Sequence, residues 1–152
     1  MIRTAPGRPR RWLARERAAT PVIVDASIAV QWFSREDGSA LATRLLEGDF
    51  ALVAPDIMPL EATNAWWKKS RRGDMAPDAV PQAVSRLLAI GIALMPSAPL
   101  LPRAARLAID LQHPVYDCVY LVLAGEHDVA LASADDRLRR AAERLDLRLW
   151  RR

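Results

Sequence analysis

Four carboxylates stand where the predicted strands and helices could bring them together: Asp25, Glu61, Asp117 and Asp135. Asp25 directly follows a short apolar run, and Asp135 follows a second run by three residues, so both lie near the carboxyl ends of predicted strands. In open parallel sheets these ends share one edge, and ligands bind there. Asp117 lies in the first turn of a predicted helix that is otherwise apolar. The pattern predicts acids gathered at one edge of a sheet.

Glu61 is predicted to face the core from a helix over residues 56–71. At 100° per residue, the apolar stripe of this helix is about 120° wide. The stripe holds Ile57, Leu60, Glu61, Asn64 and Trp67. A buried carboxylate without a partner costs several kcal/mol. A salt bridge to a buried arginine or to Lys68 would satisfy Glu61, and so would a bound cation.

Each of the other acids also has a structural explanation when it is taken alone. Asp25 could cap the helix that follows it. Ser133 and Asp136 have the spacing of a capping box, which would place Asp135 in the first turn of a helix. Asp117 could simply complement a helix dipole.

Taken together, the four acids favour a metal site. Two carboxylates about 4 Å apart repel by roughly 4 kcal/mol at an effective dielectric constant of 20. Four at one edge would protonate or separate unless a cation joined them. Ligands that are all oxygens select a hard ion, Mg²⁺ or Mn²⁺. Such an ion keeps several waters, and its usual catalytic use is phosphate chemistry.

The elements that must position these acids alternate along the chain. Strands are predicted at 22–24, 50–53, 92–95, 129–132 and 147–150, and helices at 27–33, 38–46, 56–71, 77–90, 100–111, 116–125 and 135–145. Gly73 and Gly91 are expected to end two helices, and Pro59 fits a first turn. Short apolar strands separated by helices predict an α/β fold, with a mostly parallel sheet covered on both faces.

The aromatic residues of two helices carry further expectations. Trp66 falls on the face opposite Glu61, so it is predicted to be exposed, and there it favours a protein interface over a base-stacking platform. Tyr116, Tyr120 and Leu123 share a face of the helix at 116–125 and are predicted to lie in the core.

Composition limits the class of protein. The chain has 152 residues, 51% of them apolar, which suits one compact domain. A single cysteine, Cys118, excludes a disulfide framework and favours a reducing cytoplasm. The spacing of His113 and His127 does not match a zinc-hydrolase pair. No apolar run approaches the roughly 20 residues of a membrane span, so we expect no membrane association.

Positive charge is unevenly distributed. Residues 1–20 contain six arginines and one acid, so this segment is predicted to be a flexible basic extension of the folded domain at 21–152. The remainder has 16 basic and 17 acidic residues, a net charge of −1, so nucleic-acid contacts must depend on local patches. Two candidates are a cluster of Lys68, Lys69, Arg71 and Arg72, and the seven arginines from Arg137 to Arg152. Both could equally be solvated helix faces.

Four segments, in this order, resemble the PIN-domain ribonucleases, and most closely the VapC-type toxins of type II toxin–antitoxin pairs. They are VIVDASIAVQWF (22–33), APDIMPLEATNAWWK (54–68), HPVYDCVYLVLA (113–124) and LASADDRL (131–138). The resemblance covers about residues 21–150 and implies a PIN-like three-layer α/β/α fold. It identifies the catalytic acids as Asp25, Glu61, Asp117 and Asp135, with Asp25, Asp117 and Asp135 as the metal ligands. It adds Ser27, Asn64 and Ser133 as supporting polar residues, and its spacing favours Asp135 over Asp136.

The resemblance also implies an activity and partners. The expected activity is Mg²⁺- or Mn²⁺-dependent cleavage of RNA that leaves a 3′-hydroxyl and a 5′-phosphate. The expected partners are an RNA substrate, a second copy of the chain and a small VapB-like antitoxin whose tail blocks the acidic site. A housekeeping PIN nuclease in RNA processing and a non-catalytic PIN-like scaffold stay as alternatives.

Two phosphate-handling classes also gather acids at strand ends, namely receiver domains and haloacid-dehalogenase-type phosphatases. The phosphatases need a second aspartate two residues after the first, where Ser27 stands. Both classes need a lysine late in the chain, and the only lysines are Lys68 and Lys69. These motifs disfavour both classes.

Overall fold

A computed structural model describes residues 19–34 and 39–150 of the chain. The predicted extension at 1–20 lies almost entirely outside the described residues, as do Gly38, Arg151 and Arg152. Within the described ranges, the structure contains no helix that is long and apolar enough to span a membrane.

Four parallel strands form the central sheet. They are β1 (Thr20–Val24), β2 (Phe50–Pro55), β3 (Ala93–Met95) and β4 (Ala130–Ala132), in the spatial order β3-β2-β1-β4. The prediction of a strand at 147–150 is wrong, because these residues form no strand in the structure. Leu149 forms only an isolated parallel bridge with Leu131, so this segment adds a single bridge beside β4.

In the described part of the chain, seven α-helices follow or separate the strands. They are α1 (Ala26–Trp32), α2 (Ser39–Glu47), α3 (Met58–Arg72), α4 (Ala79–Ala89), α5 (Leu101–Leu111), α6 (Val115–His127) and α7 (Asp136–Arg144). A short 3-10 turn, η1 (Ala98–Leu100), precedes α5. The predicted roles of Pro59 and Gly73 in α3 are confirmed. Pro59 lies in the first turn of the helix, and Gly73 ends it with a left-handed backbone conformation, φ +81°.

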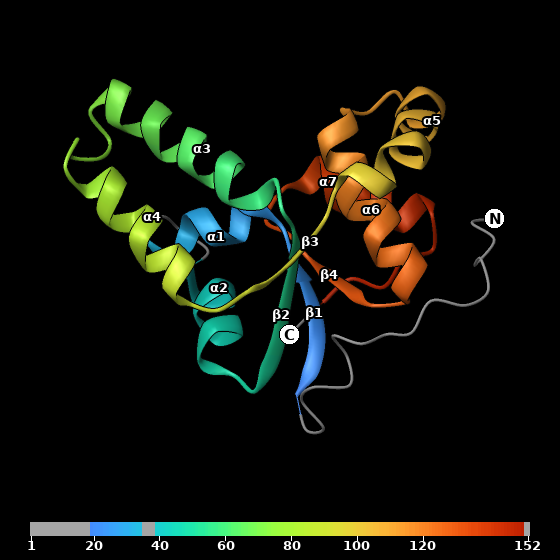
Figure 1. Cartoon of the computed structure of the whole chain (residues 1–152), viewed down its shortest axis with the longest axis horizontal. Helices are drawn as coiled ribbons and strands as arrows, with labels where there is room; N and C mark the ends of the chain where they lie inside the picture. The colour runs from blue at the N-terminus through green and yellow to red at the C-terminus, as the bar shows by residue number, and fades with distance from the viewer. Residues whose placement is uncertain (1–18, 35–38, 151–152) are drawn as a thin grey trace.

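The helices cover both faces of the sheet (Figure 1). Helices α1 to α4 lie on one side of the strands, and α5 to α7 lie on the other. Val22, Ile23 and Val24 of β1 are all fully buried, as expected for a parallel strand with helices on both sides. The predicted three-layer α/β/α architecture is confirmed.

The strand order creates a switch point beside β1. From β1 the chain builds β2 and β3 on one side, and it then returns to place β4 on the other. The backbone N–H of Asp25 donates to the carbonyl of Ala132 at 3.0 Å, which continues the ladder between β1 and β4. Ligand sites of open α/β sheets form in the crevice at such a point, beyond the carboxyl ends of the strands.

Helix α3 presents a different face to the core from the predicted one. Its buried residues are Met58, Ala62 and Trp66, and the Trp66 indole N–H donates to the Val30 carbonyl at 3.3 Å. The prediction of an exposed Trp66 is therefore wrong. Three members of the predicted core stripe are exposed instead: Leu60, Asn64 and Trp67. Apolar residues occur on more than one side of this helix, so periodicity alone could not select the face that packs against α1 and α4.

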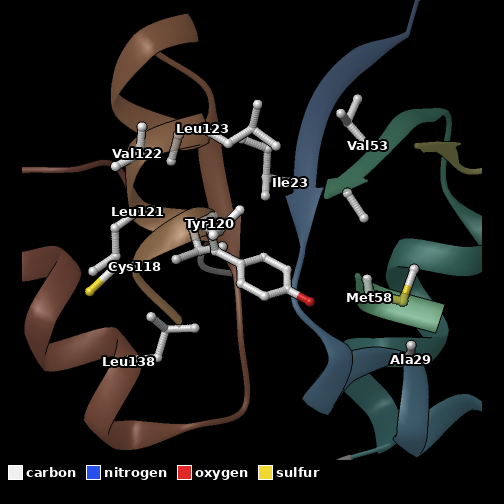
Figure 2. Packing of buried hydrophobic residues seen from close by; sticks show 14 of the residues in the cluster. Ile23, Ala29, Val53, Met58, Cys118, Tyr120, Leu121, Val122, Leu123 and Leu138 are labelled. Carbon is white, nitrogen blue, oxygen red and sulfur yellow. The ribbon is translucent and has the colours of Figure 1, made fainter. Parts of the chain in front are cut away.

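The aromatic residues of α6 divide between surface and interior. Tyr120 and Leu123 are buried as predicted, whereas Tyr116 is 54% exposed and its predicted core position is wrong. Tyr116 lies in the first turn of α6, and the continuous buried part of this helix begins only at Cys118. Figure 2 shows the Tyr120 ring beside Ile23, with its oxygen directed away from α6.

The two adjacent tryptophans of α3 give a test of this packing. Trp66→Ala should lower the free energy of unfolding by about 3–5 kcal/mol, because it empties a buried site. Trp67→Ala should lower it by less than about 1 kcal/mol, since Trp67 is half exposed and only stacks with Arg71. Urea unfolding of both variants measures the difference, and equal losses would contradict the described face of α3.

Candidate active site

Asp25 is held at the end of β1 by two serine hydroxyls. Its carboxylate is buried, and its Oδ2 accepts a hydrogen bond from Ser27 at 2.5 Å and another from Ser133 at 2.8 Å. Although Asp25 precedes α1, its side chain makes no capping hydrogen bond to that helix. The capping explanation considered for Asp25 is therefore wrong, and its carboxylate is oriented toward the β4–α7 connection.

The two serines join α1 to that connection. The Ser27 hydroxyl accepts from the backbone N–H of Ala134 at 2.9 Å, and the Ser133 hydroxyl accepts from the N–H of Asp135 at 3.0 Å. Their oxygens lie 3.4 Å apart. Residues that are far apart in the sequence therefore build one polar network around the Asp25 carboxylate.

Asp135 is the N-cap of α7. Its Oδ1 accepts from the backbone N–H groups of Arg137 at 2.7 Å and Leu138 at 3.1 Å. The capping-box alternative, which placed Asp135 in the first turn of the helix, is wrong, because Asp135 itself is the N-cap and α7 begins at Asp136. The neighbouring Asp136 is turned outward and pairs with Arg139 at 3.3 Å.

Asp117 lies in the first turn of α6 and is largely buried. The Nε2 atom of His113 is 2.9 Å from its Oδ2, one helical turn earlier in the sequence. This buried nitrogen makes no aligned hydrogen bond within the described residues. Burial and the nearby Arg137 lower the pKa of His113, whereas Asp135 raises it. Sequence reasoning missed this contact, for which the four-residue spacing was the only signal.

Glu61 has a tyrosine as its hydrogen-bond partner. The hydroxyl of Tyr120 donates to its Oε2 at 2.6 Å. Among residues 19–34 and 39–150, no arginine or lysine forms an ion pair with Glu61, so the alternative of a salt bridge to Lys68 or to a buried arginine is not found there. Asn64, one turn further along α3, is exposed and stands outside this network. Tyr120 is a second residue that sequence reasoning assigned only to the core.

Three of the acids, Asp25, Glu61 and Asp117, have raised pKa values. Burial is the main cause of all three shifts. It raises the pKa of Asp25, and it raises the pKa of Glu61 to about 7 and that of Asp117 to about 6. Asp25 further raises the pKa of both Glu61 and Asp117, and Asp135 raises that of Asp25 and Asp117. Charges influence each other in this way only at short range, so these acids lie in one region of the molecule, at the carboxyl ends of β1 and β4. Arg137 opposes the effect and lowers the pKa of Asp117.

The donor chemistry of this site fits a hard divalent cation. The hydrogen bonds described for Asp25, Glu61 and Asp135 each engage one carboxylate oxygen, Oδ2, Oε2 and Oδ1 respectively. In the placement described for 19–34 and 39–150, no three acidic, histidine or cysteine side chains are already gathered into a metal-binding group. Burial and mutual repulsion nevertheless disfavour the charged forms of Asp25, Glu61 and Asp117 in the absence of a cation, and oxygen ligands of this kind suit Mg²⁺ or Mn²⁺.

A parallel α/β/α sandwich with coupled acids at its switch point defines the class of protein. The chain belongs to the PIN domain family, whose family model matches residues 22–144. PIN domains are generally nucleases. No curated protein sequence matches the chain.

Two solved structures are similar to the chain in fold. PAE2754 from Pyrobaculum aerophilum has a TM-score of 0.65 and 21% sequence identity, and the match covers 84% of this chain and 85% of that one. VapC20 from Mycobacterium tuberculosis, a toxin that cleaves the sarcin–ricin loop, has a TM-score of 0.62 and 16% identity. That match covers 79% of this chain and 94% of VapC20.

The raised pKa of Glu61 predicts a pH-dependent stability in the absence of metal. Its contribution is fully present below about pH 4.5, the usual value for glutamate, and is lost as the pH rises through about 7. The free energy of unfolding of the wild type, measured relative to Glu61→Gln, should fall by about 1–2 kcal/mol between pH 4.5 and 8. The full pKa difference corresponds to about 3 kcal/mol, and partial exposure reduces it.

Urea unfolding in a chelator measures this difference across the pH range. Subtraction of the Glu61→Gln values removes the contribution of the groups that do not interact with Glu61. Excess Mg²⁺ should reduce the loss, because a cation stabilises the charged acids. A difference that stays constant from pH 4.5 to 8 would contradict a buried, destabilised Glu61 carboxylate.

Proposed function

We propose that this PIN domain is a Mg²⁺- or Mn²⁺-dependent endoribonuclease that acts as the toxin of a toxin–antitoxin pair. The observation that carries the proposal is the set of coupled acids at the switch point between β1 and β4. A site that keeps buried carboxylates close together without balancing cations is suited to a metal ion and a phosphodiester. The RNA substrate also implies a cytoplasmic site of action.

The proposed roles follow from where each acid is held. Asp25, Asp117 and Asp135 would hold one or two ions. When bound, such an ion polarises the phosphate and lowers the pKa of a water. Ser27 and Ser133 hold the Asp25 carboxylate through its Oδ2.

Glu61, from the neighbouring helix, orients the attacking water and accepts its proton. Attack of the water oxygen at phosphorus breaks the bond to the 3′ oxygen. That oxygen takes up a proton, and the products carry a 3′-hydroxyl and a 5′-phosphate. The proposed supporting role of Asn64, exposed one turn beyond Glu61, is to offer its amide to the RNA.

The cationic side chains proposed to bind RNA differ in whether they already interact with other groups of the protein. Arg137 donates to the carbonyl of Gln112 at 3.1 Å and lowers the pKa of Asp117, so it stands at the rim of the acidic site. Lys68 and Arg71 extend along the exposed side of α3, where Arg71 stacks on Trp67 at 5.5 Å. Arg72 is already paired with Asp74 at 3.0 Å. Lys69 also has an interaction within the protein.

The proposed protein partners are a second copy of the chain and a small VapB-like antitoxin. Large apolar side chains are exposed on both helical layers, among them Leu60 and Leu88 on one side and Leu101 and Ile109 on the other. Such side chains are typical of surfaces that bind proteins. The fold likeness to VapC20, a toxin that cleaves RNA, supports the toxin role over housekeeping RNA processing.

Removal of a metal-binding acid tests the proposed activity. Asp25→Asn and Asp117→Asn should each reduce Mg²⁺-dependent cleavage of a short RNA by about 100-fold or more, because each removes a charged ligand of the cation. Circular dichroism should show an unchanged fold. Asp136→Asn is the matched control, since this acid faces outward beside the site, and it should keep wild-type activity. Full activity of Asp25→Asn would exclude this mechanism, and a wild type without nuclease activity would favour a non-catalytic scaffold.

The position of Arg137 predicts a role in substrate affinity. Arg137→Ala should raise KM for RNA about 10-fold and reduce the slope of log affinity against log salt by about 1, since one phosphate contact is lost. Arg139→Ala is the matched control, because Arg139 lies on the same helix but pairs with Asp136. Cleavage rates and RNA binding over a range of salt concentrations measure both values. Equal effects of the two variants would show that Arg137 contributes only general positive charge.

A further inference from the structure

The side chain of Tyr120 links helix α6 to helix α3 on the buried side of the acidic site. It is fully buried in α6, one turn after Asp117, and its hydroxyl donates to Glu61 of α3 at 2.6 Å. In Figure 2 the ring extends from α6 past Ile23, and its oxygen points toward the start of α3 near Met58. The Tyr120 side chain therefore bridges α6, which carries Asp117, and α3, which carries Glu61.

The surroundings of the Tyr120 hydroxyl keep it a neutral hydrogen-bond donor. The backbone N–H of Ala26, directly after Asp25, lowers the pKa of Tyr120 by an effect smaller than that of burial. The hydroxyl hydrogen itself is donated to Glu61. Burial is the largest cause that raises the pKa of Tyr120, so the group remains a neutral donor at any pH where the protein works.

Packing alone does not explain a tyrosine at this position. The ring lies among apolar side chains such as Ile23 and Met58, where phenylalanine would fill the same space. A hydroxyl taken into this interior costs free energy unless it is hydrogen-bonded. The partner it finds is a carboxylate of the acidic site, so the hydroxyl acts on that carboxylate.

We propose that Tyr120 is a positioning residue that holds Glu61 by one carboxylate oxygen and leaves the other to take the proton of the attacking water. This inference rests on the proposed nuclease function. A glutamate side chain has three rotatable bonds, and one fixed oxygen restricts the carboxylate to a narrow range of orientations. Because Asp117 and Tyr120 are three residues apart on α6, this helix places a proposed metal ligand and also aligns the proton acceptor.

The test replaces the hydroxyl without changing the ring. Tyr120→Phe should lower kcat for a short RNA about 10- to 100-fold, as is typical when a partner of a catalytic group is lost. KM should stay within about 2-fold, because Tyr120 does not reach the surface. Tyr116→Phe is the matched control, since Tyr116 is an exposed tyrosine of the same helix, and it should leave kcat and KM unchanged.

A double mutant separates positioning from packing. If Tyr120 acts through Glu61, Tyr120→Phe should cause no further loss beyond about 2-fold when it is added to Glu61→Gln, under single-turnover conditions. The same additional loss in both backgrounds would overturn the proposal, and so would wild-type kcat in Tyr120→Phe. If Glu61→Gln has no residual activity, crystal structures decide. A Glu61 carboxylate that keeps its wild-type position in Tyr120→Phe overturns the proposal, and a displaced or disordered one supports it.

The outcomes also distinguish this inference from the proposed function. An active wild type, an inactive Asp25→Asn and a fully active Tyr120→Phe would overturn only the role of Tyr120. A wild-type protein that does not cleave RNA with Mg²⁺ or Mn²⁺ would overturn both.

Discussion

Burial of mutually repelling carboxylates at the switch point between β1 and β4 is the constraint on which the rest of this site depends. Asp25 is almost fully buried, and the pKa values of Glu61 and Asp117 are raised to about 7 and about 6. A protein selected only for stability gains little from such groups, because their desolvation is costly and their repulsion adds to the cost. Their retention at the one edge where parallel sheets bind ligands is the physical basis for the proposed metal-dependent chemistry.

The protein limits this cost by placing one or two polar groups against each acid. Two serine hydroxyls hold Asp25, the Tyr120 hydroxyl holds Glu61, the first N–H groups of α7 hold Asp135, and His113 lies against Asp117. All of these are neutral hydrogen-bonding groups or, for His113, a group whose lowered pKa favours the neutral form. Neutral partners orient a carboxylate without cancelling its charge, so the negative potential of the site remains available to a cation. A set of arginine or lysine partners would have produced a stable but chemically inert cluster.

Helix α3 shows why some expectations from the sequence were right and others wrong. The strands at 22–24 and 50–53 and the limits of α3 were predictable, because short apolar runs, Pro59 and Gly73 act locally. The buried face of α3 was not, since Met58, Ala62 and Trp66 compete with Ile57, Leu60 and Trp67 for the core. Which set is buried depends on the side chains that α1 and α4 offer. The same uncertainty concealed the Tyr120 hydroxyl, whose partner lies 59 residues away.

The sequence by itself determined the alternation of strands and helices, the placement of Asp25 and Asp135 near strand ends, and the motifs of the PIN family, because these features depend on local spacing. Only the tertiary structure decided which oxygens face which partners. It placed Ser27 and Ser133 on one oxygen of Asp25, gave Glu61 a tyrosine instead of a salt bridge, and turned Asp136 out to Arg139. These choices depend on the order β3-β2-β1-β4, which brings β4 beside β1 across more than 100 residues of chain. Long-range pairing of this kind leaves no periodic signal in the sequence, because it arises from the packing of the whole sheet.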